Sequence, residues 1–309
     1  MASVYKVVCQ PMSFYSMMYK ADTIFGAFCW SIRYFEGADA LEGLLEKFKS
    51  SPPFLLSSMM PYGYMFKPLL HPPRIESNNK SEAKGLLEKE KKRKKIQFVT
   101  IDFISKNQKN LSQAIVSDEL FNNIFDSTKI GRLEITRNAI DRITLHAREG
   151  ALFSEVFLYS EMPLVFYIKV NDEQYSEGWF ASIVEAVGLN GLGNDCSIGK
   201  GVFKMKLEKI TQQEIAMFDY FSDNYVTLSV CIGADLYPRC YTTFTRYGKL
   251  GGLYSQCGIN GSLVYCKKPV VFYHEGSVFS GNGLGSMVNN VHQEKSIVQY
   301  GYAFPLYFG

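Results

Sequence analysis

Residues 188–203 of this chain, GLNGLGNDCSIGKGVF, are rich in glycine and constrain the local fold more than any other stretch. Before them, residues 175–187 predict an amphipathic helix with Gly188 at its C-cap position, because apolar side chains recur at helical spacing. After them, apolar and lysine residues mix from Val202 onward, which is typical of a strand. Glycine frees the backbone for positive φ angles and for close approach of another backbone. The segment therefore predicts a loop that joins a helix to a strand.

The glycine loop, defined as residues 191–201, has the chemistry of a phosphate cradle. Uncovered N–H groups at glycines, together with the cation of Lys200, suit a phosphate chain. The spacing is not that of a Walker P-loop, because Gly193 and Gly199 stand one residue too far apart and Gly201 replaces the magnesium-binding hydroxyl. A P-loop also runs from strand to helix, the reverse of the order expected here. These departures argue against ATP hydrolysis at this loop.

Composition and charge limit the classes of function. With 309 residues, 47% apolar and 20% charged, the chain has the make-up of a globular protein of one large or two ordinary domains. Its net charge of +3 is weak, so any affinity for nucleic acid must come from local patches. The aromatic content of 15% supplies rings on which bases can stack.

Cysteine use and the absence of targeting signals predict a cytoplasmic protein. The seven cysteines are scattered without a CxxC pair, which favours reduced thiols over a disulfide framework or a zinc site. The first residues lack the features of a signal peptide. No apolar run approaches the roughly 20 residues that span a bilayer, so we expect no membrane contact.

The first third of the chain predicts a strand, two helices and a charged segment. Residues 4–9 form the strand, Asp22 caps a helix that ends near residue 35, and residues 41–48 form the second helix. Residues 76–95 are polar and end in KEKKRKK, which is either a solvated face or a phosphate-contact patch. Residues 98–104 are compatible with a strand or a helix.

The middle of the chain predicts a projecting hairpin. Residues 131–158 are rich in arginine and alternate in polarity, with Glu149 and Gly150 as the expected turn and a strand over 153–170. Residues 212–222 predict a linker or a short helix. The rest predicts strands and two more glycine-rich loops, with no long helix. The strands are expected at 225–235, 239–247, 262–274 and 297–308, and the loops at 248–261 and 275–286.

Catalytic motifs are absent from the sequence. Its four histidines form no metal-binding motif or adjacent His-Asp pair, and no nucleophile elbow is present. We therefore expect no metal and no cofactor. His146 lies between Arg142 and Arg148, and it is the one histidine whose setting suggests a general base for RNA cleavage without a metal, but a structural or RNA-contacting role is the preferred interpretation. Helix capping explains Asp22 better than a role as an acid beside a phosphodiester does.

Four segments together resemble the RAMP superfamily of CRISPR proteins, and within it the fourth subunit of the type III-A Csm effector complex. They are ADTIFGAF, RNAIDRITLHAREGALF, GLGNDCSIGKGVF and the closing GSVF with YGYAFPLYF, and they span nearly the whole chain in order. The stretch Asn194-Asp195-Cys196 departs from the pattern, because relatives are often more basic or serine-rich there.

The resemblance implies an α+β fold of two tandem ferredoxin-like (RRM-like) halves. Residues 1–210 would form the first half, with a thumb insertion at about 72–150 that carries the hairpin, and residues 211–309 a β-rich, degenerate second half. It also implies a non-catalytic RNA-binding subunit that grips the repeat-derived 5′ handle of the CRISPR RNA (crRNA). Such a subunit docks the large subunit, which carries the nuclease and cyclic-oligoadenylate chemistry, and contacts the first backbone subunit. It meets the target RNA only indirectly.

The resemblance also implies three groups of RNA-binding residues. At the base of the thumb they are Arg137, Asn138 and Arg142. In the glycine loop they are Gly191, Gly193, Asn194, Ser197, Gly199, Lys200 and Gly201. In a second wall of the groove they are Lys249, Gly251, Gly252, Leu253, Tyr254 and Ser255. Two alternatives stay open. One is a metal-independent endoribonuclease of the same superfamily, which would process precursor crRNA with His146 and a nearby Tyr or Lys. The other is a scaffold whose loops make only protein contacts.

Overall fold

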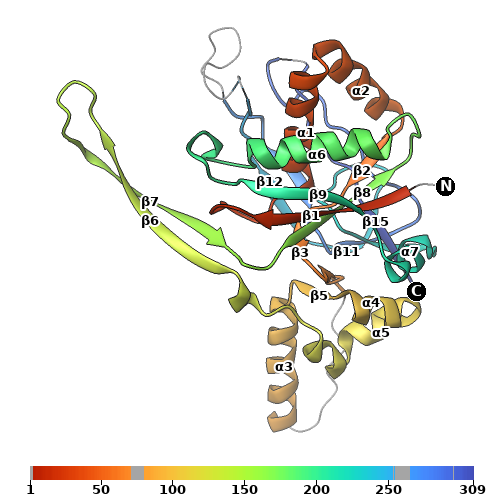
Figure 1. Cartoon of the computed structure of the whole chain (residues 1–309). Helices are drawn as coiled ribbons and strands as arrows, with labels where there is room; N and C mark the ends of the chain where they lie inside the picture. The colour runs from red at the N-terminus through yellow and green to blue at the C-terminus, as the bar shows by residue number, and fades with distance from the viewer. Residues whose placement is uncertain (1–2, 71–79, 253, 255–264, 295) are drawn as a thin grey trace.

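A computed structural model of the chain describes residues 3–70, 80–252, 254, 265–294 and 296–309. Its main sheet is antiparallel, with the strand order β2-β8-β1-β9 and the short β3 paired to β8. The helices α1 and α6 lie together over one face of this sheet (Figure 1). The elements of this part are β1 (Ser3–Pro11), α1 (Ala21–Phe35), α2 (Ala38–Ser50), β2 (Phe54–Leu56), β3 (Met60–Pro61), β8 (Leu164–Val170), α6 (Glu177–Asn190) and β9 (Phe203–Lys209).

The strand β8 is buried on both faces, which explains its nearly continuous apolar run LVFYIKV, interrupted by the half-buried Lys169. Phe166 meets Phe28 of α1, whereas Tyr167 meets Phe218 and Phe304 on the opposite face. The helices therefore cover one side of the sheet and the C-terminal part of the chain covers the other.

The C-terminal part consists of short strands held by loops. Its larger sheet has the order β11-β14-β10-β15, and β12 pairs with β13. Tyr300 accepts a hydrogen bond from the Leu56 N–H, and Tyr302 donates one to the Phe48 carbonyl, so this part shares one core with the first sheet. The elements are α7 (Gln212–Asp219), β10 (Asn224–Thr227), β11 (Tyr237–Cys240), β12 (Thr243–Arg246), β13 (Val270–Tyr273), β14 (Val278–Ser280) and β15 (Pro305–Phe308).

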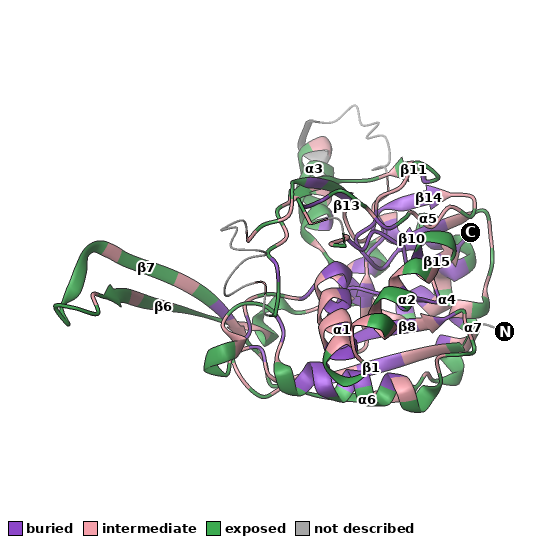
Figure 2. Ribbon diagram, turned by 90° about the horizontal axis from the view of Figure 1, so that it is seen from above, coloured by how far each residue is buried: buried purple, intermediate pink, exposed green. Residues whose placement is uncertain are grey.

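Between β3 and β8 the chain forms a helical region and a long hairpin that projects from the body (Figure 1). The hairpin strands are exposed along most of their length, in contrast to the buried body (Figure 2). The elements are β4 (Tyr64–Phe66), α3 (Lys80–Lys95), β5 (Phe98–Thr100), α4 (Ile101–Asn107), η1 (Gln108–Asn110), α5 (Leu111–Val116), η2 (Asp118–Asn122), η3 (Ser127–Lys129), β6 (Gly131–Ile140) and β7 (Ala147–Tyr159).

The expected turn of the hairpin at Glu149 and Gly150 is wrong. Both residues lie inside β7, and the chain reverses at residues 141–146. The Asp141 carboxylate accepts hydrogen bonds from the N–H groups of Ile143 and Thr144, which builds the turn by side-chain capping without a glycine. The strand expected over 153–170 is also two strands, since residues 160–163 separate β7 from β8.

Two expected helix caps are wrong. Gly188 lies within α6, where a Cβ would stand 2.5 Å from the Phe203 carbonyl oxygen, and Gly191 at φ +81° is the C-cap. Glycine at position 188 therefore allows the helix to approach β9. Asp22 lies in the first turn of α1, buried, and Lys20 is the N-cap.

The strands expected at 225–235, 262–274 and 297–308 are shorter in the structure, as β10, β13 and β15, and residues 253 and 255–264, which include most of the loop expected at 248–261, lie outside the described residues. The ambiguous residues 98–104 contain both a strand, β5, and the start of a helix, α4. The charged run is the helix α3, and α7 begins with a capping box between Thr211 and Glu214. The glycine-rich stretch 275–286, expected as a loop, contains the strand β14, which pairs with β10 and β11.

Candidate nucleic-acid interface

The glycine loop is anchored at its base and open at its outer part. Leu192 donates to the Gly201 carbonyl at 2.8 Å, Gly201 donates to the Phe14 carbonyl at 2.8 Å, and Tyr19 donates its hydroxyl to the Leu192 carbonyl. Gly201 has φ +68°, and a Cβ there would lie 2.1 Å from the Leu192 carbonyl oxygen. The base of the loop thus requires glycine for conformation and for space.

The outer part of the loop exposes backbone to solvent. Gly193, Asn194, Ser197 and Gly199 are all exposed, and a Cβ at Gly199 would meet nothing within 4 Å. Asp195 adopts a left-handed conformation at φ +65°, which aspartate tolerates better than most residues. This surface can accept a phosphate backbone without rearrangement of the core.

A cluster of charged groups joins the hairpin to the glycine loop, and we call it the hairpin–loop joint. The Asp195 carboxylate lies 2.7 Å from the Arg137 guanidinium and 3.8 Å from the Lys200 ammonium. Arg137 also pairs with Glu155 at 3.0 Å, across the hairpin. The Lys200 ammonium lies 3.3 Å from the ring centroid of Phe157. Two of the predicted phosphate-binding cations are therefore brought together and held by one carboxylate.

No motif in the sequence predicted a role for Asp195, Glu155 or Phe157. The signal for Asp195 was its acidic character in a loop expected to be basic. Glu155 and Phe157 share a face of β7 because strand side chains alternate with a period of two, so they meet the same side of the hairpin as Arg137.

The structure separates the residues expected at the base of the thumb. Arg137 contacts the glycine loop, whereas Asn138 is exposed near the outer end of β6. Arg142 lies in the turn at the tip, so its expected place at the base is wrong. The hairpin is longer than expected because β6 continues to Ile140, which pairs with Ala147 of β7.

The second glycine-rich wall packs against Trp30 of α1. A Cβ at Gly251 would lie 2.9 Å from the Trp30 ring nitrogen, and one at Gly252 would lie 2.5 Å from its ring carbon Cδ2. The Tyr254 ring meets the Trp30 ring edge to face at 5.3 Å. Lys249 is exposed. Leu253 and Ser255 lie outside the described residues.

The described residues offer no recognisable group of metal ligands and no partner that orients His146, the candidate general base. Within the described part of the chain, no three His, Cys, Asp or Glu side chains are grouped as a metal site. His146 lies exposed in the tip turn of the hairpin, and no hydrogen bond or ion pair orients its side chain among the described residues.

Comparison with known families matches residues 14–204 to the model described as the RAMP superfamily. The chain belongs to the RAMP superfamily. The match begins after β1 and runs through α1 to the start of β9, so it includes the hairpin and the glycine loop. The resemblance noted in the four sequence segments is confirmed at this level.

Individual RAMP proteins resemble the chain over nearly its full length. The "CRISPR system Cms protein Csm4" of Thermococcus onnurineus (strain NA1) is 24% identical over 93% of this chain and 90% of its own length. A chain in a Csm3-Csm4 subcomplex of the type III-A CRISPR-Cas interference complex has the same fold, with a TM-score of 0.63 and 18% identity over 99% of both chains. A chain of a Csm1-Csm4 cassette in complex with cA4 gives 0.62 and 18%, over 99% of this chain and 98% of that one. The chain is thus a RAMP protein similar to Csm4.

No helix within the described residues is both long and apolar enough to cross a membrane.

Proposed function

We propose that this chain is the non-catalytic RNA-binding subunit that grips the 5′ handle of crRNA in a type III-A CRISPR interference complex. The observation that carries the proposal is the hairpin–loop joint, which holds Arg137 and Lys200 beside the exposed backbone of the glycine loop. Phosphates of a single strand would exchange for the Asp195 carboxylate on these cations. The exposed loop N–H groups would then hold the neighbouring phosphate oxygens.

The predicted site residues enter this proposal with different roles. Arg137 and Lys200 neutralise phosphates, and residues Gly191, Gly193, Asn194, Ser197, Gly199 and Gly201 line the path of the backbone. Asn138, on the outer part of the hairpin, contacts RNA where the handle meets the spacer. Arg142, at the tip, reaches farther along the guide than the sequence indicated. Lys249, Gly251, Gly252 and Tyr254 form a second wall beside Trp30.

The proposal includes tandem ferredoxin-like halves, residues 1–210 and 211–309, with the thumb within 72–150. The order β2-β8-β1-β9, with α1 and α6 on one face, supports a ferredoxin-like first half. The C-terminal sheet β11-β14-β10-β15 is likewise antiparallel and supports a degenerate second copy. The hairpin extends through residue 159, so the thumb ends later than the sequence indicated.

The proposed partners are the large subunit, which carries the nuclease and cyclase chemistry, and a backbone RAMP subunit, in the cytoplasm. Similarity to chains from a Csm1-Csm4 cassette and a Csm3-Csm4 subcomplex supports these two contacts. Target RNA is met through the guide. The exposed setting of His146 gives no support to the alternative, a metal-independent endoribonuclease.

The direct test is to purify the tagged protein from its own cells and to sequence the RNA that accompanies it. We expect guides that share one repeat-derived 5′ end, together with a large partner. A clean preparation without crRNA would contradict the proposal. Incubation of the protein with repeat RNA in EDTA tests the alternative, since cleavage that is lost in His146→Ala would establish the nuclease.

A further inference from the structure

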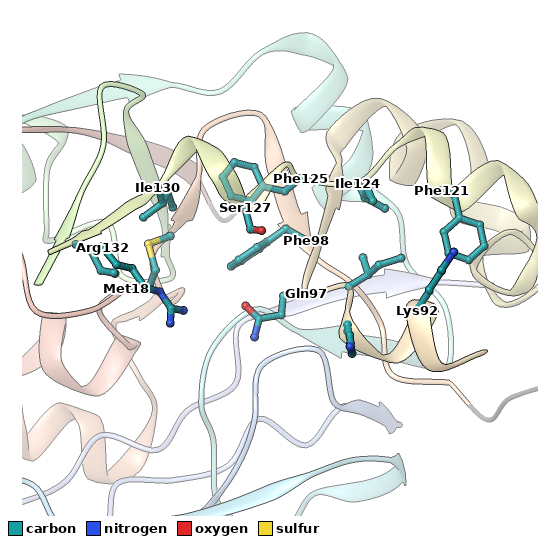
Figure 3. A pocket seen from close by; sticks show the side chains of 13 residues that line it. Met18, Lys92, Gln97, Phe98, Phe121, Ile124, Phe125, Ser127, Ile130 and Arg132 are labelled. Carbon is teal, nitrogen blue, oxygen red and sulfur yellow. The ribbon is translucent and has the colours of Figure 1, made fainter. Parts of the chain in front are cut away.

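A groove lies beneath the hairpin, between the end of α3, the segment that leads into β6, and the base of β7. Its cavity of about 450 Å³ falls within the usual range for small-ligand sites. Figure 3 shows Phe98 at the centre, with Lys92 and Arg132 on opposite sides of it. The lining residues are Met18, Lys92, Lys95, Ile96, Gln97, Phe98, Phe121, Ile124, Phe125, Ser127, Ile130, Arg132 and Leu158.

The groove combines aromatic rings with a purely basic set of charges. Phe98, Phe121 and Phe125 contribute three rings to its lining. Among the described residues that line it, the charged ones are Lys92, Lys95 and Arg132. Lysines at the end of α3 also suit the dipole of that helix, so the basic run by itself does not define a site. The cavity lined by aromatic rings beside these lysines is a second observation, independent of the helix dipole, that points to a ligand site.

This groove and the hairpin–loop joint lie on opposite faces of the hairpin. Arg132 and Arg137 are separated by an odd number of positions along β6, and strand side chains alternate between faces. On β7, Leu158 lines the groove, whereas its neighbour Phe157 packs against Lys200. A ligand in the groove therefore does not touch the cations proposed to hold the handle.

We propose that the groove is a second nucleic-acid subsite, which binds an unstacked nucleotide of a single strand. The base would stack on the phenylalanine rings, and the phosphates on either side would meet Lys92 and Arg132. In a single strand, a phosphate lies on either side of each base. Positive charges on either side of the phenylalanine rings are complementary to this arrangement. An acidic peptide from a partner protein is the competing occupant. This inference does not require that the glycine loop bind the handle.

Photocrosslinking of the full chain with a short oligouridylate that carries 5-iodouridine tests the groove directly. The probe lacks the handle sequence, so failure of handle recognition does not affect the result. We expect mass spectrometry to place crosslinks on peptides that contain Phe121 or Phe125. Crosslinks confined to other parts of the chain would overturn the proposal, as would displacement of the probe's crosslink by an acidic partner peptide.

Variants separate the groove from the general charge of α3. Phe121→Leu should weaken oligouridylate binding by about 5-fold to 150-fold, the range of one base–aromatic stack. Lys92→Gln, at an exposed position, leaves the core intact and should flatten the log–log salt dependence by about 0.7. Lys94→Gln is the matched control, because Lys94 is exposed on the same helix but does not line the groove. Equal effects of Lys92→Gln and Lys94→Gln would overturn the proposal.

Discussion

Two sets of ion pairs in this molecule differ in the burial of their carboxylates. The seam pairs, Lys20–Glu275 and Asp22–Arg246, join α1 to the C-terminal part, and the Glu275 and Asp22 side chains are 5% and 3% exposed. At the hairpin–loop joint the Asp195 side chain is 24% exposed, whereas the cations Lys20, Arg246 and Arg137 are alike at 21%, 20% and 25%, so the two sets differ in their carboxylates. The Asp195 side chain as a whole is more open to water than the seam carboxylates, although its Oδ2 atom and the Lys200 Nζ atom are shielded from solvent. The seam carboxylates are therefore the less screened of the two sets, and the proposed function requires the Asp195 carboxylate to give way to a phosphate.

The seam also explains why Asp22 is not a helix cap. Its carboxylate pairs with Arg246 at 2.6 Å and accepts a hydrogen bond from the Gln299 amide at 2.7 Å. Burial raises the pKa of the Asp22 carboxyl above its usual value, although the positive charges of Arg246 and Lys267 act to lower it. A residue read as a local cap thus connects segments more than two hundred positions apart.

Removal of a seam charge should have the largest effect. Glu275→Gln leaves Lys20 without its partner, so we expect the free energy of unfolding to fall by about 3 kcal/mol. The control Asp118→Asn breaks the exposed pair with Lys89 and should leave stability nearly unchanged. Urea denaturation measures both. Equal losses would remove the distinction between buried and exposed pairs.

The seam also predicts a pH dependence. Burial raises the pKa of Glu275, but the hydrogen bond from His274 and the charge of Lys20 outweigh it and hold the pKa at about 2. This lies below the usual value of about 4.3 in an unfolded chain. The contribution is therefore complete above pH ~4.3 and is lost as the pH falls toward 2. Glu275→Gln should flatten the stability profile in this window, and an unchanged profile would contradict the assignment.

Substitutions at the base and the rim of the glycine loop should have smaller, unequal effects. In Gly201→Ala the new Cβ would clash with the Leu192 carbonyl, and alanine would have to adopt a positive φ. We therefore expect the free energy of unfolding to fall by about 2–3 kcal/mol. Gly199→Ala has a similar φ of +80° in open space and should cost only about 1 kcal/mol. Thermal unfolding of the pair tests whether the base of the loop is the rigid part. A larger loss of stability in Gly199→Ala than in Gly201→Ala would mean that the rim of the loop, and not its base, is the rigid part.

Neutralisation of the joint should raise affinity for RNA. Asp195→Asn keeps the side-chain shape and the tolerance for a left-handed backbone, but it frees Lys200 from the carboxylate and leaves Arg137 paired with Glu155 alone. Because a partly exposed pair contributes at most about 1 kcal/mol, handle RNA should bind up to ~5-fold more tightly. Fluorescence anisotropy in the assembled complex measures this. Asp219→Asn, away from the joint, is the control, and weaker binding by Asp195→Asn would mean that the carboxylate itself contacts the RNA.

Loss of one joint cation should have the smallest effect. Lys200→Ala removes one phosphate contact, which should flatten the log–log salt dependence of handle binding by about 0.7. Titrations at several salt concentrations give the slope. An unchanged slope would exclude Lys200 from the RNA site and leave it as a structural partner of Asp195 and Phe157.

Much of the fold was predictable because it follows from local periodicity. The opening strand, the first two helices and the helix–loop–strand order around the glycine loop are confirmed within a few residues. The errors lie where distant contacts override local signals. Gly188 permits close packing on β9 rather than capping α6, and the Asp141 carboxylate turns the hairpin where no glycine marks a turn.

The family, the α+β class and the glycine-rich loop that carries Lys200 could be predicted from the sequence alone, since these depend on residues that are neighbours along the chain. Three contacts became apparent once the chain was folded: Asp195 holds Arg137 and Lys200, Asp22 belongs to the seam, and Lys92 and Arg132 flank one groove. Each of these depends on the distance between side chains that are remote in sequence. Local periodicity carries no information about that distance, because packing of the whole chain sets it.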